Sequence, residues 1–352
     1  MSEGALSPNR RSFLAGSAAA LGTGFAFPRA IAAQSAGPRR IDVHNHLIPP
    51  AYLAAGRPQI TAGSDTDPTP VLNWSPARAI DEMDRNGVAT AMLSMSTPGI
   101  SSLGGGREAW RKLARACNEY AASLLHDFPG RFGNFAALPL PDVEGSLAEA
   151  VYALDVLKAD GIGILTSYGT TYPGDASFRP LFAELNRRQA VVFVHPTAPA
   201  CCATILPGIA PSTDEFMFDV TRAITSMLFG GTFASFPDIR FIFTHAGATI
   251  MPIAARINAY GARHHEYDAA NPHGVYYELK KLHYDIANSA NPSAMAALMD
   301  LVPVTQILFG SDTPYVPIVA TATNFTKMTF PDDVRAAIDR GNALGLFPRL
   351  AG

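Results

Sequence analysis

Eight apolar runs of strand length recur along the chain, and each is followed by a segment long enough for a helix. Their approximate bounds are 41–46, 89–96, 132–139, 161–167, 190–195, 240–245, 282–287 and 306–311. Strand and helix alternating eight times are typical of an α/β protein with a parallel sheet closed into a barrel. The pattern therefore predicts a (β/α)8 fold, the TIM-barrel architecture.

Helix-like stretches lie between these runs, and some carry recognisable end signals. Ser75 before Pro76 has the form of an N-cap followed by a proline at the first helical position, and Gly87 and Gly161 follow expected helix ends. The expected helices span residues 76–86, 108–128, 146–159, 178–188, 221–236, 292–301 and 331–340. We expect residues 34–352 to form a single barrel domain.

Titratable side chains stand at the ends of several of the apolar runs. His44 and His46 end the first run, His195 and His245 end the fifth and sixth, and Asp312 follows the eighth. A lone buried histidine is more often a hydrogen-bonded core residue than a ligand, but burying several such groups is costly unless they are paired or bind metal. The carboxyl ends of barrel strands share one mouth, where active sites form. We expect all five side chains to point into that mouth.

The first run, IDVHNH at residues 41–46, alternates with a period of two, so His44 and His46 project from the same face of one strand. Two neighbouring imidazoles can share one cation, and a carboxylate such as Asp312 is an ordinary additional ligand. Ligands of this kind suit Zn²⁺ and its first-row neighbours. The residues predict a metal centre, with Zn²⁺ favoured and Mn²⁺ the alternative.

Composition places the chain among soluble globular enzymes: 352 residues, 48% hydrophobic, 16% charged, with a formal net charge of -3. Nothing in it indicates binding to nucleic acid or to an anionic membrane. The three cysteines, Cys117 and the adjacent Cys201 and Cys202, have no CxxC spacing and do not predict a disulfide framework. We expect Cys201 and Cys202 to be small buried hydrophobic residues, with a place near the site, shortly after His195, as the alternative.

The N-terminal segment differs from the rest of the chain. Asn9-Arg10-Arg11-Ser12-Phe13-Leu14 precedes an Ala/Gly/Phe-rich stretch, and Ala30-Ile31-Ala32 supplies small residues that a signal peptidase accepts. The apolar stretch is too short and too glycine-rich for a stable membrane span. We interpret residues 1–33 as a twin-arginine signal peptide, cleaved near Ala32 or Ala33, and expect a periplasmic or secreted protein. An uncleaved anchor or leader is the alternative.

Four motifs carry a family resemblance: DVHNH, VVFVHPT, FTHAGATIMPIAARI and LFGSDTPY. In combination they resemble the amidohydrolase superfamily of metal-dependent hydrolase barrels, and within it the branch similar to aminocarboxymuconate-semialdehyde decarboxylase, amidohydrolase family 2. The resemblance covers essentially the whole of residues 34–352. The stretches LKADGIGILTSYG, FRPLFAELNRRQAVVFVHPT and GNALGLFPRL are most similar to 6-methylsalicylate decarboxylases.

The resemblance implies a ligand set for one divalent metal ion and further roles at matching positions. The ligands would be His44, His46, His195 and Asp312. It implies that His245 is a catalytic acid or base beside the metal. It also implies that Arg256, eleven residues after His245, binds a substrate carboxylate in a neighbouring subunit, which requires a homodimer or a higher homo-oligomer. The alternative for Arg256 is an ordinary surface arginine.

The end of the fourth run favours a single metal ion. Binuclear members of the superfamily bridge two metals with a carboxylated lysine there, whereas residues 161–168 read GIGILTSY. A single metal weakens a binuclear hydrolase reading without excluding a mononuclear one.

The expected function is metal-dependent, non-oxidative decarboxylation of an ortho-hydroxybenzoate-type acid, with release of CO₂. The partner would be a small aromatic or unsaturated carboxylic acid. Asp312 is the first candidate to protonate the ring carbon that bears the carboxyl group, and His245 would orient it or hold the metal water. Two alternatives remain open: a mononuclear metal-dependent hydrolase of a lactone, amide or ester, and a non-catalytic exported binding protein.

Overall fold

The computed structural model describes residues 39–62, 67–202 and 204–351, and the predicted signal peptide at 1–33 lies outside them. Eight parallel strands pair in chain order from β1 to β8. They are β1 (Arg40–His46), β2 (Val88–Ser94), β3 (Phe132–Ala137), β4 (Gly161–Leu165), β5 (Val191–His195), β6 (Arg240–Phe243), β7 (His283–Asp285) and β8 (Ile307–Leu308).

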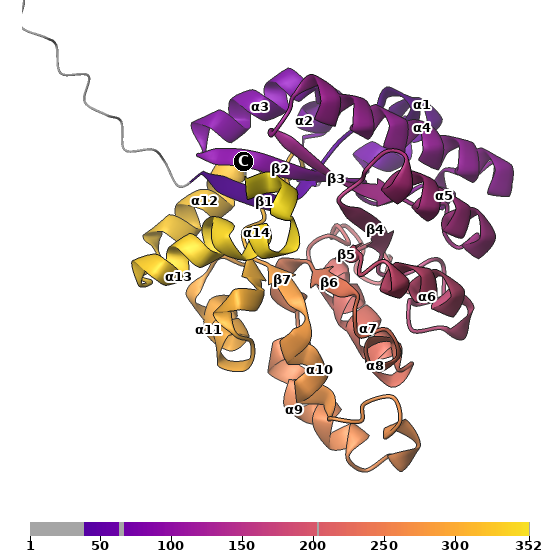
Figure 1. Cartoon of the computed structure of the whole chain (residues 1–352), viewed down its shortest axis with the longest axis vertical. Coiled ribbons are helices and arrows are strands. Elements are labelled where there is room, and N and C mark those ends of the chain that lie inside the picture. Colours follow the sequence, from indigo (N-terminus) through magenta and orange to yellow (C-terminus); the bar gives the residue numbers. More distant parts are fainter. Residues whose placement is uncertain (1–38, 63–66, 203, 352) are drawn as a thin grey trace, which may run out of the picture. The chain divides into compact units, whose positions relative to one another are not determined.

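The chain after β8 returns to β1. The Val43 N–H donates to the Phe309 carbonyl at 2.9 Å, and the Asp312 N–H donates to the His44 carbonyl at 2.7 Å. These bonds join the last strand to the first, and helices surround the strands (Figure 1). The predicted (β/α)8 fold is confirmed.

The connecting segments contain more helices than the sequence pattern predicts. They are α1 (Pro50–Thr61), α2 (Thr69–Leu72), α3 (Pro76–Arg85), α4 (Gly106–Asp127), α5 (Val143–Asp155), α6 (Arg179–Arg187), α7 (Glu215–Phe229), α8 (Thr232–Ser235), α9 (Ile250–Gly261), α10 (Val275–Lys281), α11 (Pro292–Leu301), α12 (Ile318–Lys327), α13 (Asp332–Ala336) and α14 (Asn342–Leu346). Among the described residues, no helix combines the length and apolar character that crossing a membrane requires.

Some predicted helix ends are correct and others are not. Ser75 caps α3 as expected, because its hydroxyl oxygen accepts from the Arg78 N–H at 3.3 Å. The helix predicted over 221–236 instead begins at Glu215 and divides into α7 and α8 near Gly231, whose φ is +68°. Gly161 does not end a helix but begins β4, where a Cβ atom would lie 2.5 Å from the Val191 carbonyl oxygen. Glycine is therefore required there by the close approach of two strands.

The barrel interior is packed with aromatic and aliphatic side chains beneath the mouth. Phe135 of β3 and Phe193 of β5 stack with ring centroids 5.0 Å apart, and the His44 ring lies edge-on to Phe193 at 5.2 Å. Val43 belongs to the same buried cluster as Phe193. Val43 and His44 are adjacent in β1, yet both side chains reach the interior. The reason is a shift of register in the pairing of β1 with β2 between Asp42 and Asn45.

The C-terminal residues complete this interior cluster. Ala343 and Leu346 of α14, with Phe347 and Leu350 just after it, are buried against side chains from the strands. The Phe347 ring meets Phe135 edge-on at 5.7 Å. The helix α14 contacts β8, the last strand of the barrel. The fold therefore places apolar packing directly below a polar mouth.

Candidate metal centre

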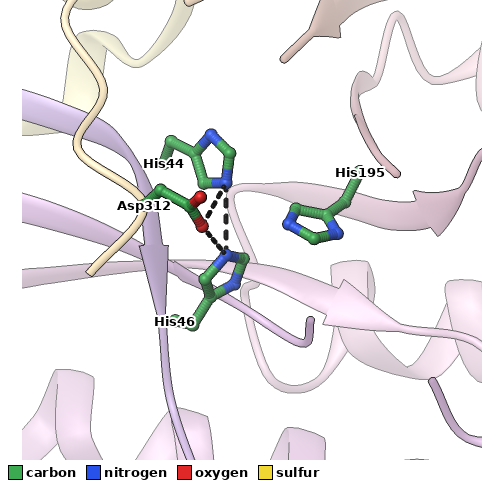
Figure 2. A group of neighbouring side chains, drawn as sticks. All are labelled: His44, His46, His195 and Asp312. Carbon is green, nitrogen blue, oxygen red and sulfur yellow. Dashed lines mark hydrogen bonds and ion pairs between the residues drawn. The ribbon is translucent and has the colours of Figure 1, made fainter. Parts of the chain in front are cut away.

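Four of the residues predicted from the sequence converge at the mouth of the barrel (Figure 2). His44 and His46 lie in β1, His195 ends β5, and Asp312 lies in the loop after β8. The Nε2 atoms of His44 and His46 are 3.2 Å apart, and Asp312 Oδ1 lies 3.2 and 3.1 Å from them. One possible ligand atom from each of the four residues lies within 4.8 Å of the others. Residues separated by more than 200 positions in the sequence thus form one cluster.

Hydrogen bonds at the outer ring nitrogen orient each imidazole toward this cluster. In all three rings Nδ1 faces an oxygen that accepts a hydrogen bond, so Nδ1 carries the proton and Nε2 presents its lone pair inward. The acceptors are Asp285 Oδ2 for His44 at 3.0 Å, the Ser94 carbonyl for His46 at 3.3 Å, and the Pro196 carbonyl for His195 at 2.8 Å.

Three lone pairs and one carboxylate oxygen therefore face a common point. All three histidines are buried, and the Asp312 side chain is only 14% exposed. Unprotonated nitrogens 3.2 Å apart repel one another unless a positive charge lies between them. Three imidazole nitrogens with one carboxylate oxygen are ligands that suit Zn²⁺ and its first-row neighbours. The donor set fits one divalent metal ion.

The electrostatics of the cluster without a metal ion support this interpretation. Burial opposes charge on His44, but the Asp285 and Asp312 carboxylates outweigh it and raise the pKa of His44 to about 10. Burial lowers the pKa of His46, and it lowers that of His195 well below the ordinary value. The cluster thus attracts one positive charge while its other imidazoles stay neutral, as metal ligands must be.

His245 lies beside the cluster in a tight turn after β6. Its ring centroid is 5.0 Å from that of His44, its Nδ1 donates to the Ala287 carbonyl at 3.0 Å, and its φ is +55°. Burial, together with the neighbouring His44, lowers the pKa of His245. Its Nε2 is therefore a neutral acceptor next to the four-residue cluster.

Sequence reasoning missed Asp285, the last residue of β7. This fully buried carboxylate accepts from His44 Nδ1 through Oδ2, and from the His245 N–H at 3.1 Å and the Ala287 N–H at 2.9 Å through Oδ1. It thus supports two of the predicted histidines at once. Its place at the end of a strand is the same signal that identified the others, but the predicted run over 282–287 extends past Asp285, so the residue did not stand at its end.

A cavity of about 550 Å³ opens above the cluster. Its volume is in the range of ordinary small-molecule sites. The lining residues are Asp67, Ser96, Thr97, His195, Ser212, Thr213, Phe216, Met217, His245, Asn288, Asp312, Tyr315 and Val316. Apolar and aromatic side chains thus face hydroxyl and amide groups, and none of the described lining residues is a lysine or an arginine.

Arg256 lies apart from this cavity. It is exposed on α9 and does not line the cavity of its own chain, so its predicted role in a neighbouring subunit stays a prediction.

The prediction that Cys201 and Cys202 are buried hydrophobic residues was wrong, because Cys201 is exposed and forms a disulfide with Cys202. Cys117 is buried and free. The pair lies in the long connection between β5 and α7, which runs over the surface, where side chains meet solvent rather than the core.

Comparisons with known proteins agree with this geometry. The sequence model of the amidohydrolase family matches residues 41–349. A decarboxylase of Aspergillus niger is 37% identical over 331 residues, covering 88% of each chain. The 6-methylsalicylic acid decarboxylase of Penicillium expansum is 33% identical over 319 residues, covering 89% of this chain and 97% of its own. A solved amidohydrolase structure superposes with a TM-score of 0.80 at 26% identity, covering 88% and 99% of the two chains. The resemblance inferred from the sequence motifs is confirmed.

Proposed function

The chain belongs to the amidohydrolase family, and on this premise we propose that it is a metal-dependent carboxy-lyase that releases CO₂ from an ortho-hydroxybenzoate-type acid such as 6-methylsalicylate. The observation that carries the proposal is the convergence of three imidazole lone pairs and the Asp312 carboxylate below a cavity large enough for one substituted aromatic ring. The similar decarboxylases, matched over most of their length, support the reaction type.

The proposed ligands of the metal ion are His44, His46, His195 and Asp312. Zn²⁺ is the proposed ion, with Mn²⁺ as the alternative, because nitrogen-rich sets with one carboxylate suit both. When bound, the ion would neutralise the substrate carboxylate and favour the phenolate form of its ortho hydroxyl.

Proton transfer is assigned to Asp312. As a ligand of the metal ion, this carboxylate would begin the reaction ionised. It accepts the proton of the ortho hydroxyl and delivers it to the ring carbon that bears the carboxylate. The carbon–carbon bond then breaks, CO₂ leaves, the ring regains aromaticity, and the product departs as a phenolate that solvent protonates.

His245 is assigned a supporting role in the same step. Because its Nδ1 is engaged by the Ala287 carbonyl, its Nε2 is free to accept a hydrogen bond from a hydroxyl or a water at the cavity floor. It would hold the reacting group in line with Asp312. The same neutral nitrogen could instead activate a water for attack on a carbonyl, which is the chemistry of the alternative function, hydrolysis of a lactone, amide or ester.

The deciding experiment is CO₂ release by purified, metal-analysed protein from a panel of ortho-hydroxybenzoates that includes 6-methylsalicylate. The His195→Ala variant, which removes one proposed ligand, is the metal-poor control. Release that disappears in the control is the expected result. A fully metallated protein that releases no CO₂ from any acid, yet hydrolyses a lactone or an ester, would replace this proposal with the hydrolase.

We also propose export through the twin-arginine pathway, based on the Arg10-Arg11 motif and the residues after it. Exchanging both arginines for lysine should abolish appearance of the protein in the periplasmic or extracellular fraction. Unchanged export would overturn this assignment.

We propose a homodimer or higher homo-oligomer. None of the described residues that line the cavity is a lysine or an arginine that could pair with a substrate carboxylate, and Arg256 is exposed on the surface, where it could reach the cavity of a second copy. If Arg256 serves the cavity of a second copy, Arg256→Ala should raise KM for the acid. Light scattering should find more than one chain per particle. A monomeric active protein would contradict the proposal.

A further inference from the structure

The two oxygens of Asp312 have different surroundings. Oδ1 faces the imidazole cluster, 3.2 Å from His44 Nε2 and 3.1 Å from His46 Nε2. Oδ2 accepts a hydrogen bond from Asn288 Nδ2 at 2.9 Å. Asp312 and Asn288 both line the cavity. One oxygen of this carboxylate thus faces the candidate ligands His44 and His46, and the other faces Asn288, which also lines the cavity.

The backbone at both ends of this hydrogen bond is held in an uncommon conformation. Asn288 has a φ of +54° and Asp312 a φ of +75°, in the left-handed region that favours glycine. Asparagine and aspartate tolerate this region better than most residues. Such conformations cluster at functional sites, where the surrounding structure holds them in place.

The loop that carries Asn288 serves the whole centre. Asp285, the last residue of β7, accepts from the His44 ring. In the loop that follows, the Ala287 carbonyl accepts from the His245 ring, and Asn288 donates to Asp312. Each of these contacts orients a different candidate catalytic or ligand residue.

We infer that Asn288 is a positioning residue that determines which oxygen of Asp312 binds the metal and which one exchanges the proton with the substrate. The amide donor occupies Oδ2 and prevents the carboxylate from turning both oxygens toward the metal position. Oδ2 therefore stays at the cavity surface, in reach of the acid. This inference rests on the proposed decarboxylation for its kinetic consequence, but not for its effect on the carboxylate.

Asn288→Gly separates the effect of the side-chain amide from that of the backbone conformation. Glycine adopts a positive φ without strain, so the loop should keep its course while the hydrogen bond is lost. Asn288→Ala removes the same amide but leaves a side chain in an unfavourable backbone region. Gln189→Gly is the matched control, because Gln189 also has a positive φ, +52°, and precedes β5 at the opposite end of that strand from His195.

The first readout needs no substrate. With Co²⁺ as the bound ion, we expect the visible absorption of Asn288→Gly to weaken relative to wild type, because the freed carboxylate can bind through both oxygens and raise the coordination number. Gln189→Gly should leave the spectrum unchanged. A wild-type spectrum in both Asn288 variants would overturn the inference, whether or not the protein releases CO₂.

The second readout is kinetic. We expect kcat to fall about ten- to a hundredfold in both Asn288 variants, with little change in KM, since supporting hydrogen bonds at metal centres have effects of this size. The melting temperature should be maintained in the glycine variant and lowered only in the alanine variant. If kcat fell only in the alanine variant, in parallel with its melting temperature, Asn288 would have a merely structural role. If KM rose while kcat stayed normal, Asn288 would instead contact the substrate. Either result would overturn the inference. Absence of CO₂ release from the wild type would reject the proposed function alone.

Discussion

Asp285→Asn tests how the centre holds its ligands. The native carboxylate makes three hydrogen bonds, one from His44 Nδ1 through Oδ2 and two from the His245 and Ala287 N–H groups through Oδ1. An asparagine has one carbonyl oxygen to replace them. If this oxygen keeps the two backbone donors, the amide N–H₂ faces His44 Nδ1, which must then give up its proton. The proton moves to Nε2, where it blocks the position of the metal.

The opposite orientation of the amide is also unfavourable. Its oxygen would accept from His44, but two buried backbone N–H groups would lose their acceptor, each at about 1–3 kcal/mol. We therefore expect the dissociation constant for Zn²⁺ to rise about ten- to a hundredfold, which corresponds to about 1.4–2.8 kcal/mol of binding free energy. CO₂ release at limiting Zn²⁺ should fall with occupancy and recover in part when the ion is in excess.

Competition between the protein and a chromophoric chelator at fixed pH measures this dissociation constant. Asp219→Asn is the matched control, because Asp219 is also fully buried but has no candidate ligand among its partners. It accepts from the hydroxyl groups of Thr166, Ser167 and Tyr172 and pairs with Arg222 at 3.9 Å. It should lower the stability of the protein and leave Zn²⁺ affinity near the wild-type value. An Asp285→Asn protein that binds Zn²⁺ as tightly as wild type would refute the argument that this carboxylate selects the His44 tautomer.

Three further outcomes are expected. Mild reduction should expose two thiols, those of Cys201 and Cys202, to a colorimetric reagent; Cys117 should react only after unfolding, because burial and the nearby Glu149 charge raise the pKa of its thiol to about 12. Arg40→Ala should destabilise the fold by about 3–5 kcal/mol in urea unfolding, because it leaves the buried Asp339 without its partner at 2.7 Å; a loss below about 1 kcal/mol, the size of an exposed pair, would contradict this. Removal of the metal ion with a chelator should lower the melting temperature and abolish CO₂ release, and Zn²⁺ should restore both.

The parts of the fold predicted from the sequence are those that local pattern determines. The hydrophobic runs gave eight strands in the correct order because strand order in this barrel follows chain order. The polar residues at their ends gave His44, His46, His195 and Asp312 because carboxyl ends of parallel strands share one edge. The eighth strand was predicted over 306–311 but pairs with β7 only at Ile307 and Leu308. Asp312 nevertheless lies at the mouth, as predicted.

Tertiary contacts account for what the sequence pattern did not reveal. Asp285 is separated from His44 by 241 residues, and no local signal links them. Asn288 contacts Asp312 only because a left-handed turn reverses the chain after β7. The exposure of Cys201 depends on the course of a surface connection rather than on its neighbours in sequence. The helices α9 and α12 were missed although their buried residues recur at helical spacing. Pro252 in α9 and the many β-branched residues of α12 weaken the local helix signal.

The closure of β1 onto the residues after β8 has a consequence for how the protein is made. The candidate ligands extend from His44, in the first strand of the barrel, to Asp312, which follows the last strand and is synthesised long after it. A nascent chain therefore has three of the ligands long before it has the fourth, and it cannot close the barrel until Phe309 and Asp312 reach β1. The complete set of candidate ligands can therefore form only after the last strand of the barrel has been made.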